Sequence, residues 1–300
     1  MNWETKRNLY MNIHHIIEQS ISGLKSKQEP DYIAALVTHL PVPLSSVLNK
    51  ALPNLKFKVG GCFIHQKPLT TFCDPKLSTK SPEIGDLLII YKEIRSSGDV
   101  YNALLLQAKK ATNIYKAVVS KTDYHQLLLY TKWPKFEYAR AGALNGRIRS
   151  IQPKSITPGA QYLLIDDSGR SFPSPCGITT FWCAMPDNIL VANNSLALQI
   201  IKLLEFQTGR PFDKKNNSRY LDHWSKMIWD LLNLSSVSCF NRRKAGYNNV
   251  SRQAGDAISL IINRNNDKCT EYQLPDEGGI SIICIEGVVN ERVDELNEIE

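Results

Sequence analysis

The sequence has no run of about 18 or more apolar residues, the length that a membrane-spanning helix needs. Its first residues are polar, and no apolar signal segment follows them. The seven cysteines are odd in number and include no Cys-x-x-Cys pair, which favours reduced thiols over a disulfide framework. We therefore expect a cytoplasmic protein with no membrane partner.

Motifs of several common site classes are also missing. There is no Gly-x-x-x-x-Gly-Lys loop, so an ATP-driven motor is not expected. There is no Gly-x-Ser-x-Gly motif, which disfavours the serine hydrolases that carry it. His14, His15 and His125 lack the partner spacing that zinc requires. Any chemistry has to come from other residues.

What the sequence does have is the composition of a folded protein. Its 300 residues are 43% hydrophobic and 22% charged, enough to bury a sizeable core without disulfides. This length permits one large domain or two modest ones.

Positive charge is concentrated in one part of the chain. From Gln107 to Lys154 there are ten Lys or Arg residues and only two acids, Asp123 and Glu137, which gives this stretch a net charge of +8 against +7 for the whole chain. The end of the chain, from Glu286 to Glu300, holds six acids and one arginine. A concentrated basic stretch suits a polyanion binder, and it is equally typical of a solvated helical face.

Hydrophobic spacing predicts helices in the first fifty residues. Apolar residues recur every three or four positions between Leu9 and Ile21, a second helix begins near Pro30, and a third covers Leu44–Leu52. Later helices are expected at Asp123–Trp133, after a Ser195 cap, and after an Asp222 cap.

Short apolar runs between these helices predict strands. The runs are Phe57–His65, Leu87–Tyr91, Ala103–Leu106, Tyr162–Ile165, Ala257–Ile262 and Ile280–Ile285. The turn signature at 96–99 favours an antiparallel hairpin centred near Ser97. The order of elements predicts a mixed α/β layered fold. We place a boundary near residue 170, with a core at 1–170 and an α+β extension at 171–300, and one compact domain is the alternative.

Polar residues stand at the ends of the two hairpin strands. Asp86 opens the first strand, and Gln107 and Lys109 close the second. Gln107 and Lys109 share one face of the sheet because they are two residues apart. A turn centred on Ser97 puts Asp86 opposite residue 108, on the other face. A half-step shift of the turn, or one bulge, brings it onto theirs, and the sequence does not fix the register that finely.

Converging side chains at this position would suit a magnesium or manganese site. Mg²⁺ prefers oxygen ligands and keeps several waters, so Asp86 and the Gln107 amide oxygen could help to hold it. Lys109 could then stabilise charge that develops on a phosphate. The alternative is a surface salt bridge at a strand end, with Gln107 and Lys109 simply solvated.

A second pair of polar residues lies on the helix that follows. Gln126 and Tyr130 are four apart and therefore share one helix face. An amide and a phenol on one stripe can contact phosphate or a base, although such a pair is more often a helix edge.

Gly85-Asp86, Gln107-Ala108-Lys109 and Gln126-x-x-x-Tyr130, in this order, resemble the PD-(D/E)XK nuclease superfamily and its RecB-like branch. The resemblance covers roughly residues 55 to 170. It implies a restriction-endonuclease-like mixed sheet flanked by helices, Mg²⁺-dependent phosphodiester hydrolysis, and DNA as the usual substrate, with RNA not excluded. Asp86, Gln107 and Lys109 match the catalytic motif, and Gln126 and Tyr130 match the helix motif that contacts substrate. Family habit also suggests genome defence in a prokaryote or phage.

The sequence departs from the family pattern at two places. Gln107 stands where an acid is usual, which removes one negative charge from the metal site, and Glu83 is a candidate to replace it. Many members also have an acid in the preceding helix, for which Glu18 and Glu29 are both candidates.

The chain around the helix motif alternates aromatic and basic residues between Tyr130 and Arg140. Such aromatics pack in the core or stack on bases. We include Lys110, Lys132 and Arg140 in the expected nucleic-acid contact. The basic loop at 241–244 is a second contact or a solvated turn.

Two other functions remain open at this stage. One is a catalytically inactive nucleic-acid binder, for which Gln107 would mark a weakened metal site. The other is a module that binds a partner protein through its basic stretch. A homo-oligomer or a regulatory partner is compatible with all three.

Overall fold

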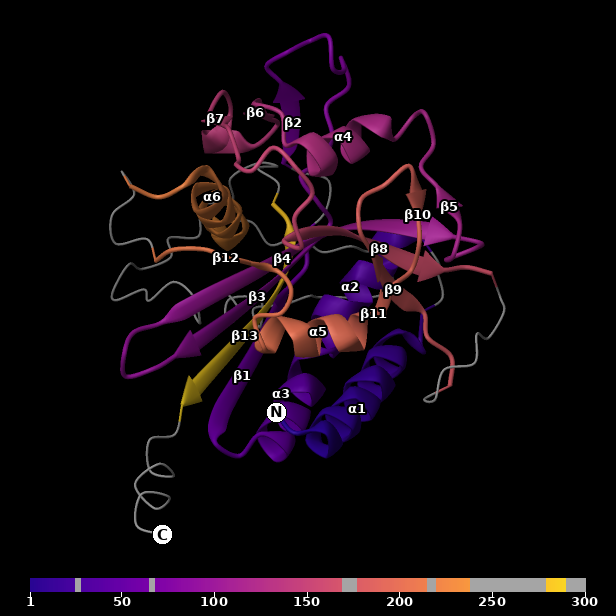
Figure 1. The fold of residues 1–300 in the computed structure, drawn as a ribbon, viewed down its shortest axis with the longest axis vertical. Helices are drawn as coiled ribbons and strands as arrows, with labels where there is room; N and C mark the ends of the chain where they lie inside the picture. The colour runs from indigo at the N-terminus through magenta and orange to yellow at the C-terminus, as the bar shows by residue number, and fades with distance from the viewer. Residues whose placement is uncertain (25–27, 65–67, 169–176, 215–219, 238–278, 290–300) are drawn as a thin grey trace.

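The computed structural model describes residues 1–24, 28–64, 68–168, 177–214, 220–237 and 279–289. The described chain has a mixed α/β fold with one eight-stranded sheet that carries helices on both faces (Figure 1). From edge to edge the strands are β1 (Leu55–Cys62), β13 (Ser281–Val289), β3 (Leu87–Ile94), β4 (Val100–Ala111), β8 (Ala160–Asp166), β9 (Phe181–Ala184) and β11 (Asn194–Ser195), with β12 (Arg210–Pro211) paired to β4. The mixed α/β class expected from the sequence is confirmed.

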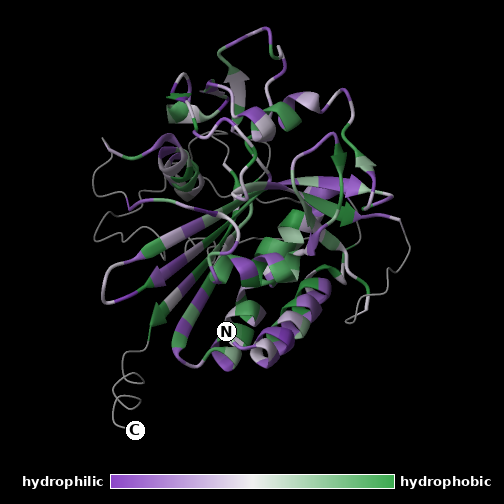
Figure 2. Cartoon of the chain, in the orientation of Figure 1, coloured by the Kyte–Doolittle hydropathy of each residue, from purple (hydrophilic) through white to green (hydrophobic). Residues whose placement is uncertain are grey.

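Four helices pack on one face of this sheet, and their buried side chains join the strands in a single apolar cluster. They are α1 (Trp3–Ile21), α2 (Glu29–His39), α3 (Pro41–Ala51) and α5 (Leu196–Leu204). A second cluster on the opposite face contains α4 (Tyr124–Lys132) and α6 (His223–Val237). Figure 2 shows hydrophobic residues where these layers meet and hydrophilic residues on the outward side of α1.

Each predicted helix is present, and the two predicted caps of α5 and α6 are formed. The Ser195 hydroxyl accepts a hydrogen bond from the main-chain nitrogen of Leu198, which caps α5. Asp222 accepts one from Ser225 at the start of α6. In both cases the cap satisfies a main-chain donor that has no partner within the helix.

The predicted hairpin is also present, with its register fixed by the structure. β3 and β4 pair antiparallel from Leu87 opposite Leu106 to Glu93 opposite Val100. The turn centre therefore falls between Ser96 and Ser97, half a step from the symmetric arrangement about Ser97. This shift decides which face of the sheet Asp86 occupies.

A small structure stands over one end of the main sheet, at the top of Figure 1. It contains a three-stranded sheet of β2 (Leu69–Phe72), β6 (Phe136–Ala139) and β7 (Ile148–Arg149), together with α4 and the 3-10 turn Gly142–Leu144. Nearby, β5 (Ala117–Val118) pairs with β10 (Ile189–Leu190). We call residues 68–82 and 112–158 the cap.

The two sequence ranges on either side of residue 170 both supply strands to the main sheet. β13 lies between β1 and β3, antiparallel to the first and parallel to the second. This arrangement is expected if both ranges form one compact domain. The strand predicted at 257–262 and the basic loop at 241–244 lie outside the described residues.

In the described part of the chain, no single helix is long and apolar enough to cross a membrane. Taken together, α2 and α3 have the length and apolar composition of a membrane span, but they are bent by 51° relative to each other. Most side chains of α2 are buried in the core, which accounts for its apolar composition.

Candidate active site

Asp86 immediately precedes β3. The expectation that Gln107 and Lys109 close the second strand is wrong, because β4 continues to Ala111 and both residues pair with β8 within the sheet. The main-chain nitrogen of Asp86 donates to the Leu106 carbonyl at 2.9 Å, which extends the β3–β4 pairing by one residue and sets Asp86 opposite Gln107. Residues 86, 107 and 109 consequently share the face of the sheet that carries α4. The half-step shift considered from the sequence is the register that the structure has.

The Asp86 carboxylate is held by β4. Its Oδ2 accepts hydrogen bonds from the side-chain nitrogen of Gln107 and from the main-chain nitrogen of Ala108, the latter at 2.7 Å. The Gln107 amide oxygen is buried and has no hydrogen-bond partner in the described structure. An unpaired buried oxygen is costly, so it is a natural position for a ligand that accepts electron density.

Two further carboxylates gather beside Asp86. Glu83 is within hydrogen-bonding reach of it, and the charge of Glu29 acts on both. Burial, reinforced by repulsion from Glu83, raises the pKa of Asp86 well above its ordinary value. Burial also raises the pKa of Glu83. Three acids, two from the segment before β3 and one from α2, thus lie together, and a positive ion would relieve their repulsion.

Of the two candidate upstream acids, Glu29 is the one near this group. It is the first residue of α2 and accepts a hydrogen bond from the main-chain nitrogen of Lys110 at 2.7 Å. Glu18, on α1, instead accepts hydrogen bonds from the main-chain nitrogen and the hydroxyl of Thr180, one at each carboxylate oxygen.

The Lys109 ammonium forms an ion pair with Asp123, the residue before α4. Asp123 does not use its side chain to cap that helix, and it also accepts a hydrogen bond from the Ser120 hydroxyl at 2.9 Å. Partial burial favours a higher pKa for Asp123, but the hydrogen bonds from Lys109 and Ser120 outweigh it and lower the pKa. Lys109 is therefore held in place by a charged partner.

Tyr130 lies behind Asp86 rather than at the surface. Its ring is 2% exposed, and its hydroxyl donates to the Ile84 carbonyl at 2.7 Å. Burial, with the nearby charge of Asp86, raises the pKa of this phenol well above its ordinary value. Gln126, one helical turn earlier, is partly exposed. Of the two motif residues, Gln126 is thus the one with surface to offer a bound molecule.

The group suits a hard divalent cation by its donors, although no three His, Cys, Asp or Glu side chains within the described ranges are arranged to hold a metal by themselves. Asp86 and Glu83 provide carboxylate oxygens, and Gln107 provides the unpaired amide oxygen. Mg²⁺ is usually held by one or two carboxylates with several waters, so two carboxylates and one amide oxygen are enough to bind it.

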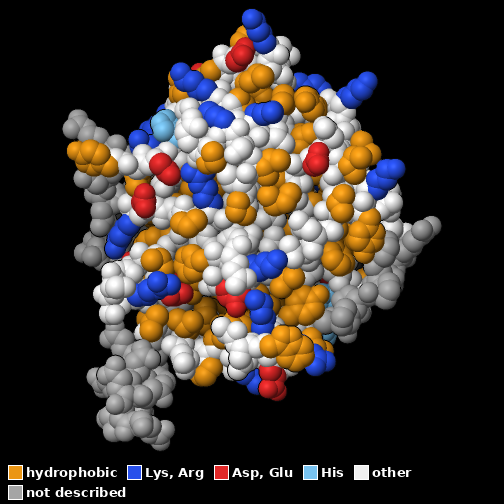
Figure 3. Space-filling view, viewed as in Figure 1, with side chains coloured by type: hydrophobic (Ala, Val, Ile, Leu, Met, Phe, Trp, Pro, Cys, Tyr) orange, Lys and Arg blue, Asp and Glu red, His pale blue; other side chains and the backbone are white. Residues whose placement is uncertain are grey.

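The cap carries most of the positive charge near this group. Residues 68–82 and 112–158 contain ten Lys or Arg and three acids, a net charge of +7. Figure 3 shows Lys and Arg side chains around the upper part of the molecule, where Figure 1 draws the cap. Arg149 is paired with Asp230, and Lys154 donates to the Trp133 carbonyl. Eight exposed cations have no ion pair among the described residues: Lys76, Lys80, Lys116, Lys121, Lys132, Lys135, Arg140 and Arg147.

The aromatic residues between Tyr130 and Arg140 are packing elements. Trp133 and Phe136 are fully buried, and Tyr138 is 1% exposed. They form ring contacts with one another and with Trp224 of α6. Of the predicted cationic contacts, Lys132 and Arg140 are exposed, whereas Lys110 is paired with Asp167 at 2.9 Å.

Sequence reasoning missed Asp123 as the partner of Lys109. The sequence marks Asp123 only as one of two acids in a basic stretch and as the start of a helix. Its position just before α4 predicts a helix cap, whereas its side chain pairs with Lys109 instead, so no local signal identified this contact.

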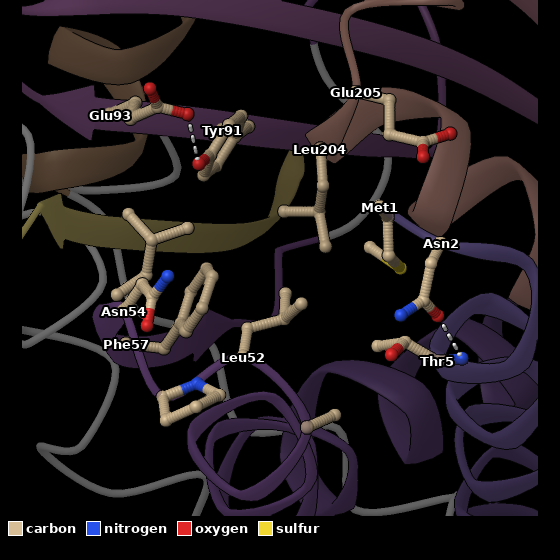
Figure 4. A pocket seen from close by; sticks show the side chains of 13 residues that line it. Met1, Asn2, Thr5, Leu52, Asn54, Phe57, Tyr91, Glu93, Leu204 and Glu205 are labelled. Carbon is tan, nitrogen blue, oxygen red and sulfur yellow. Dashed lines mark hydrogen bonds between the residues drawn. The ribbon is translucent and has the colours of Figure 1, made fainter. Parts of the chain in front are cut away.

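The pocket of about 380 Å³ in Figure 4 lies at the other end of β3. It is lined by Leu52, Phe57, Tyr91, Glu93 and Leu204 among others, and its Tyr91 hydroxyl donates to Glu93 at 2.5 Å. Glu93 lies seven positions along the chain from Asp86, roughly 20 Å in an extended strand. This pocket is therefore separate from the candidate site.

Comparison of the chain with models of protein families, with curated proteins and with solved structures gives no match.

Proposed function

We propose that this protein is a Mg²⁺-dependent nuclease of the PD-(D/E)XK type with a restriction-endonuclease-like sheet, acting on DNA. The observation that carries the proposal is the convergence of Asp86, Gln107 and Lys109 on one face of the sheet, with Glu83 and Glu29 beside them. The basic cap beside this group supports a polyanionic substrate.

The protein's own residues would divide the work as follows. Asp86 and Glu83, with the Gln107 oxygen, would bind the metal, which supplies an activated water and neutralises charge on the phosphate. Lys109, fixed by Asp123, would stabilise the negative charge that develops on the phosphate oxygens. Tyr130 and Ala108 would position Asp86 from behind and from the side.

One feature favours a second candidate, an inactive nucleic-acid binder. Gln107 is neutral, and its side-chain nitrogen already donates a hydrogen bond to one carboxylate oxygen of Asp86. With one charge fewer, the site would bind a cation more weakly than a site with two acids at these positions. This candidate predicts salt-sensitive binding to nucleic acid without cleavage.

The deciding experiment is cleavage of single-stranded DNA, double-stranded DNA and RNA with Mg²⁺, with Mn²⁺ and with chelator. Asp86→Ala and Lys109→Ala are the test variants. Asp187→Ala and Lys58→Ala, exposed residues outside the group, are the matched controls. We expect metal-dependent cleavage by the wild type and by both controls, and at least a hundredfold loss in both test variants, a size typical of removing one electrostatic contact in an active site.

Cleavage that survives Asp86→Ala would refute the assigned site. Intact substrate in every lane, together with salt-dependent binding, would favour the inactive binder. Intact substrate without binding would favour the partner-protein hypothesis.

A further inference from the structure

The exposed aromatic side chains of the cap lie in one short segment. Tyr115 is 48% exposed and Tyr124 is 50% exposed, whereas the aromatic residues between 130 and 140 are buried. Tyr124 is the first residue of α4 and directly follows Asp123, the partner of Lys109. Tyr115 lies four residues beyond the end of β4, the strand that carries Lys109.

Cations accompany both tyrosines in this segment. Lys116 and Lys121 are exposed, and neither has an ion pair among the residues that the structure describes. A single exposed tyrosine is ordinary on a protein surface. Two exposed rings with two exposed lysines between them in the sequence suit both parts of a nucleic-acid strand, since rings stack on bases and lysines neutralise phosphates.

We infer that the segment 115–124 is a platform for single-stranded nucleic acid, with Tyr115 and Tyr124 stacking on unpaired bases. A duplex offers its phosphates to the lysines but keeps its bases paired and stacked within the helix, so it cannot use the rings. This inference deepens the proposed function, on which it rests, by naming a strand with unpaired bases as the substrate class. Tyr124 directly follows Asp123, so the platform adjoins in sequence the residue that pairs with Lys109.

The test is binding rather than cleavage, so that it does not depend on the nuclease reaction. Fluorescence anisotropy with chelator present would compare oligo-dT, oligo-U and a blunt DNA duplex, each about 16 nucleotides or base pairs long, near the upper end of common site sizes. Test variants are Tyr124→Ala and Tyr115→Ala. Tyr124→Phe keeps the ring, and Tyr220→Ala removes an 80% exposed tyrosine outside the cap.

We expect the tighter of the two single strands to bind roughly tenfold more tightly than the duplex, and each alanine variant in the platform to lose about tenfold of that affinity. Tyr124→Phe and Tyr220→Ala should bind like the wild type. The better binder of oligo-dT and oligo-U identifies DNA or RNA as the strand. Equal affinity for the duplex, or wild-type binding by both alanine variants, would overturn the inference.

The outcome is separable from that of the proposed function. Loss of binding in the tyrosine variants without any cleavage would keep the platform and remove the nuclease. Metal-dependent cleavage with unaffected binding in those variants would keep the nuclease and remove the platform.

Discussion

The Tyr130 hydroxyl donates a hydrogen bond to the Ile84 carbonyl across 46 residues of sequence, at 2.7 Å. Ile84 lies between Glu83 and Gly85, so this bond ties α4 to the turn that presents the two site carboxylates. The helix motif thus acts on the candidate site through the main chain behind Asp86.

Tyr130→Phe should destabilise the fold by about 1–3 kcal/mol, because it removes the donor and leaves a buried carbonyl without its partner. Chemical denaturation of both proteins measures this difference. Tyr124→Phe, at an exposed position on the same helix, should change the free energy of unfolding by less than about 0.5 kcal/mol. Equal effects of the two substitutions would show that the Tyr130 bond does not contribute to stability.

Gly85 leaves no room for a side chain, because Tyr130 of α4 and Leu105 of β4 pack against it. A Cβ atom at this position would lie 2.9 Å from the Tyr130 hydroxyl and 2.8 Å from the Leu105 side chain. Gly85→Ala should therefore cost about 1–3 kcal/mol of stability and displace Asp86. Gly23→Ala is the matched control, since nothing lies within 4 Å of a Cβ there. Thermal unfolding of the two variants tests this, and an unchanged melting temperature for Gly85→Ala would contradict the packing.

The elements that the sequence predicted correctly are those with strong local signals. The helix at Trp3–Ile21 has a regular apolar spacing, and the Ser195 cap marks the start of α5. β3 and β4 were visible as apolar runs on either side of a turn signature. For the same reason, Asp86, Gln107 and Lys109 could be placed near one another before the structure was known.

Other features depend on contacts that local sequence does not encode. The hairpin register depends on whether the turn is centred on Ser97 or between Ser96 and Ser97. This difference decides which face of the sheet Asp86 occupies. The strands β2, β6 and β7 have only two to four residues each, too few for a period-two pattern. Whether an aromatic residue is buried or exposed is decided by tertiary packing, which buried Trp133 and left Tyr124 at the surface.

His14 should make stability depend on pH. Its side chain is buried and hydrogen-bonded to the Thr179 hydroxyl at 2.8 Å, and burial lowers its pKa from 6.5. As the pH falls, the unfolded chain takes up the proton first. The stability that neutral His14 contributes is present above pH 6.5 and is lost as the pH falls toward the lowered folded-state value.

Between pH 7 and 5, His14→Gln should therefore lose less stability than the wild type. The difference is at most about 1.4 kcal/mol for each pH unit, the limit for one proton. Urea denaturation at several pH values gives both curves. Parallel curves would mean that His14 does not titrate differently on folding.

The position of β13 can be tested through a buried ion pair between two strands. Lys92 of β3 and Glu286 of β13 are opposite in the sheet register, and their charged atoms lie 2.8 Å apart with side chains 5% and 9% exposed. Glu286→Ala leaves the lysine charge buried without this partner, so it should cost about 3–5 kcal/mol. Lys214→Ala, which removes an ion pair whose lysine is 53% exposed, should cost less than about 1 kcal/mol.

The exchange of both charges, Lys92→Glu with Glu286→Lys, provides the specific control. If the two residues face each other as described, the double variant should recover a large part of the stability lost by either single charge reversal, because the pair is restored. Additive losses in this double-mutant cycle would show that the residues do not interact. Such a result would mean that β13, at the end of the described chain, does not lie between β1 and β3 in this register.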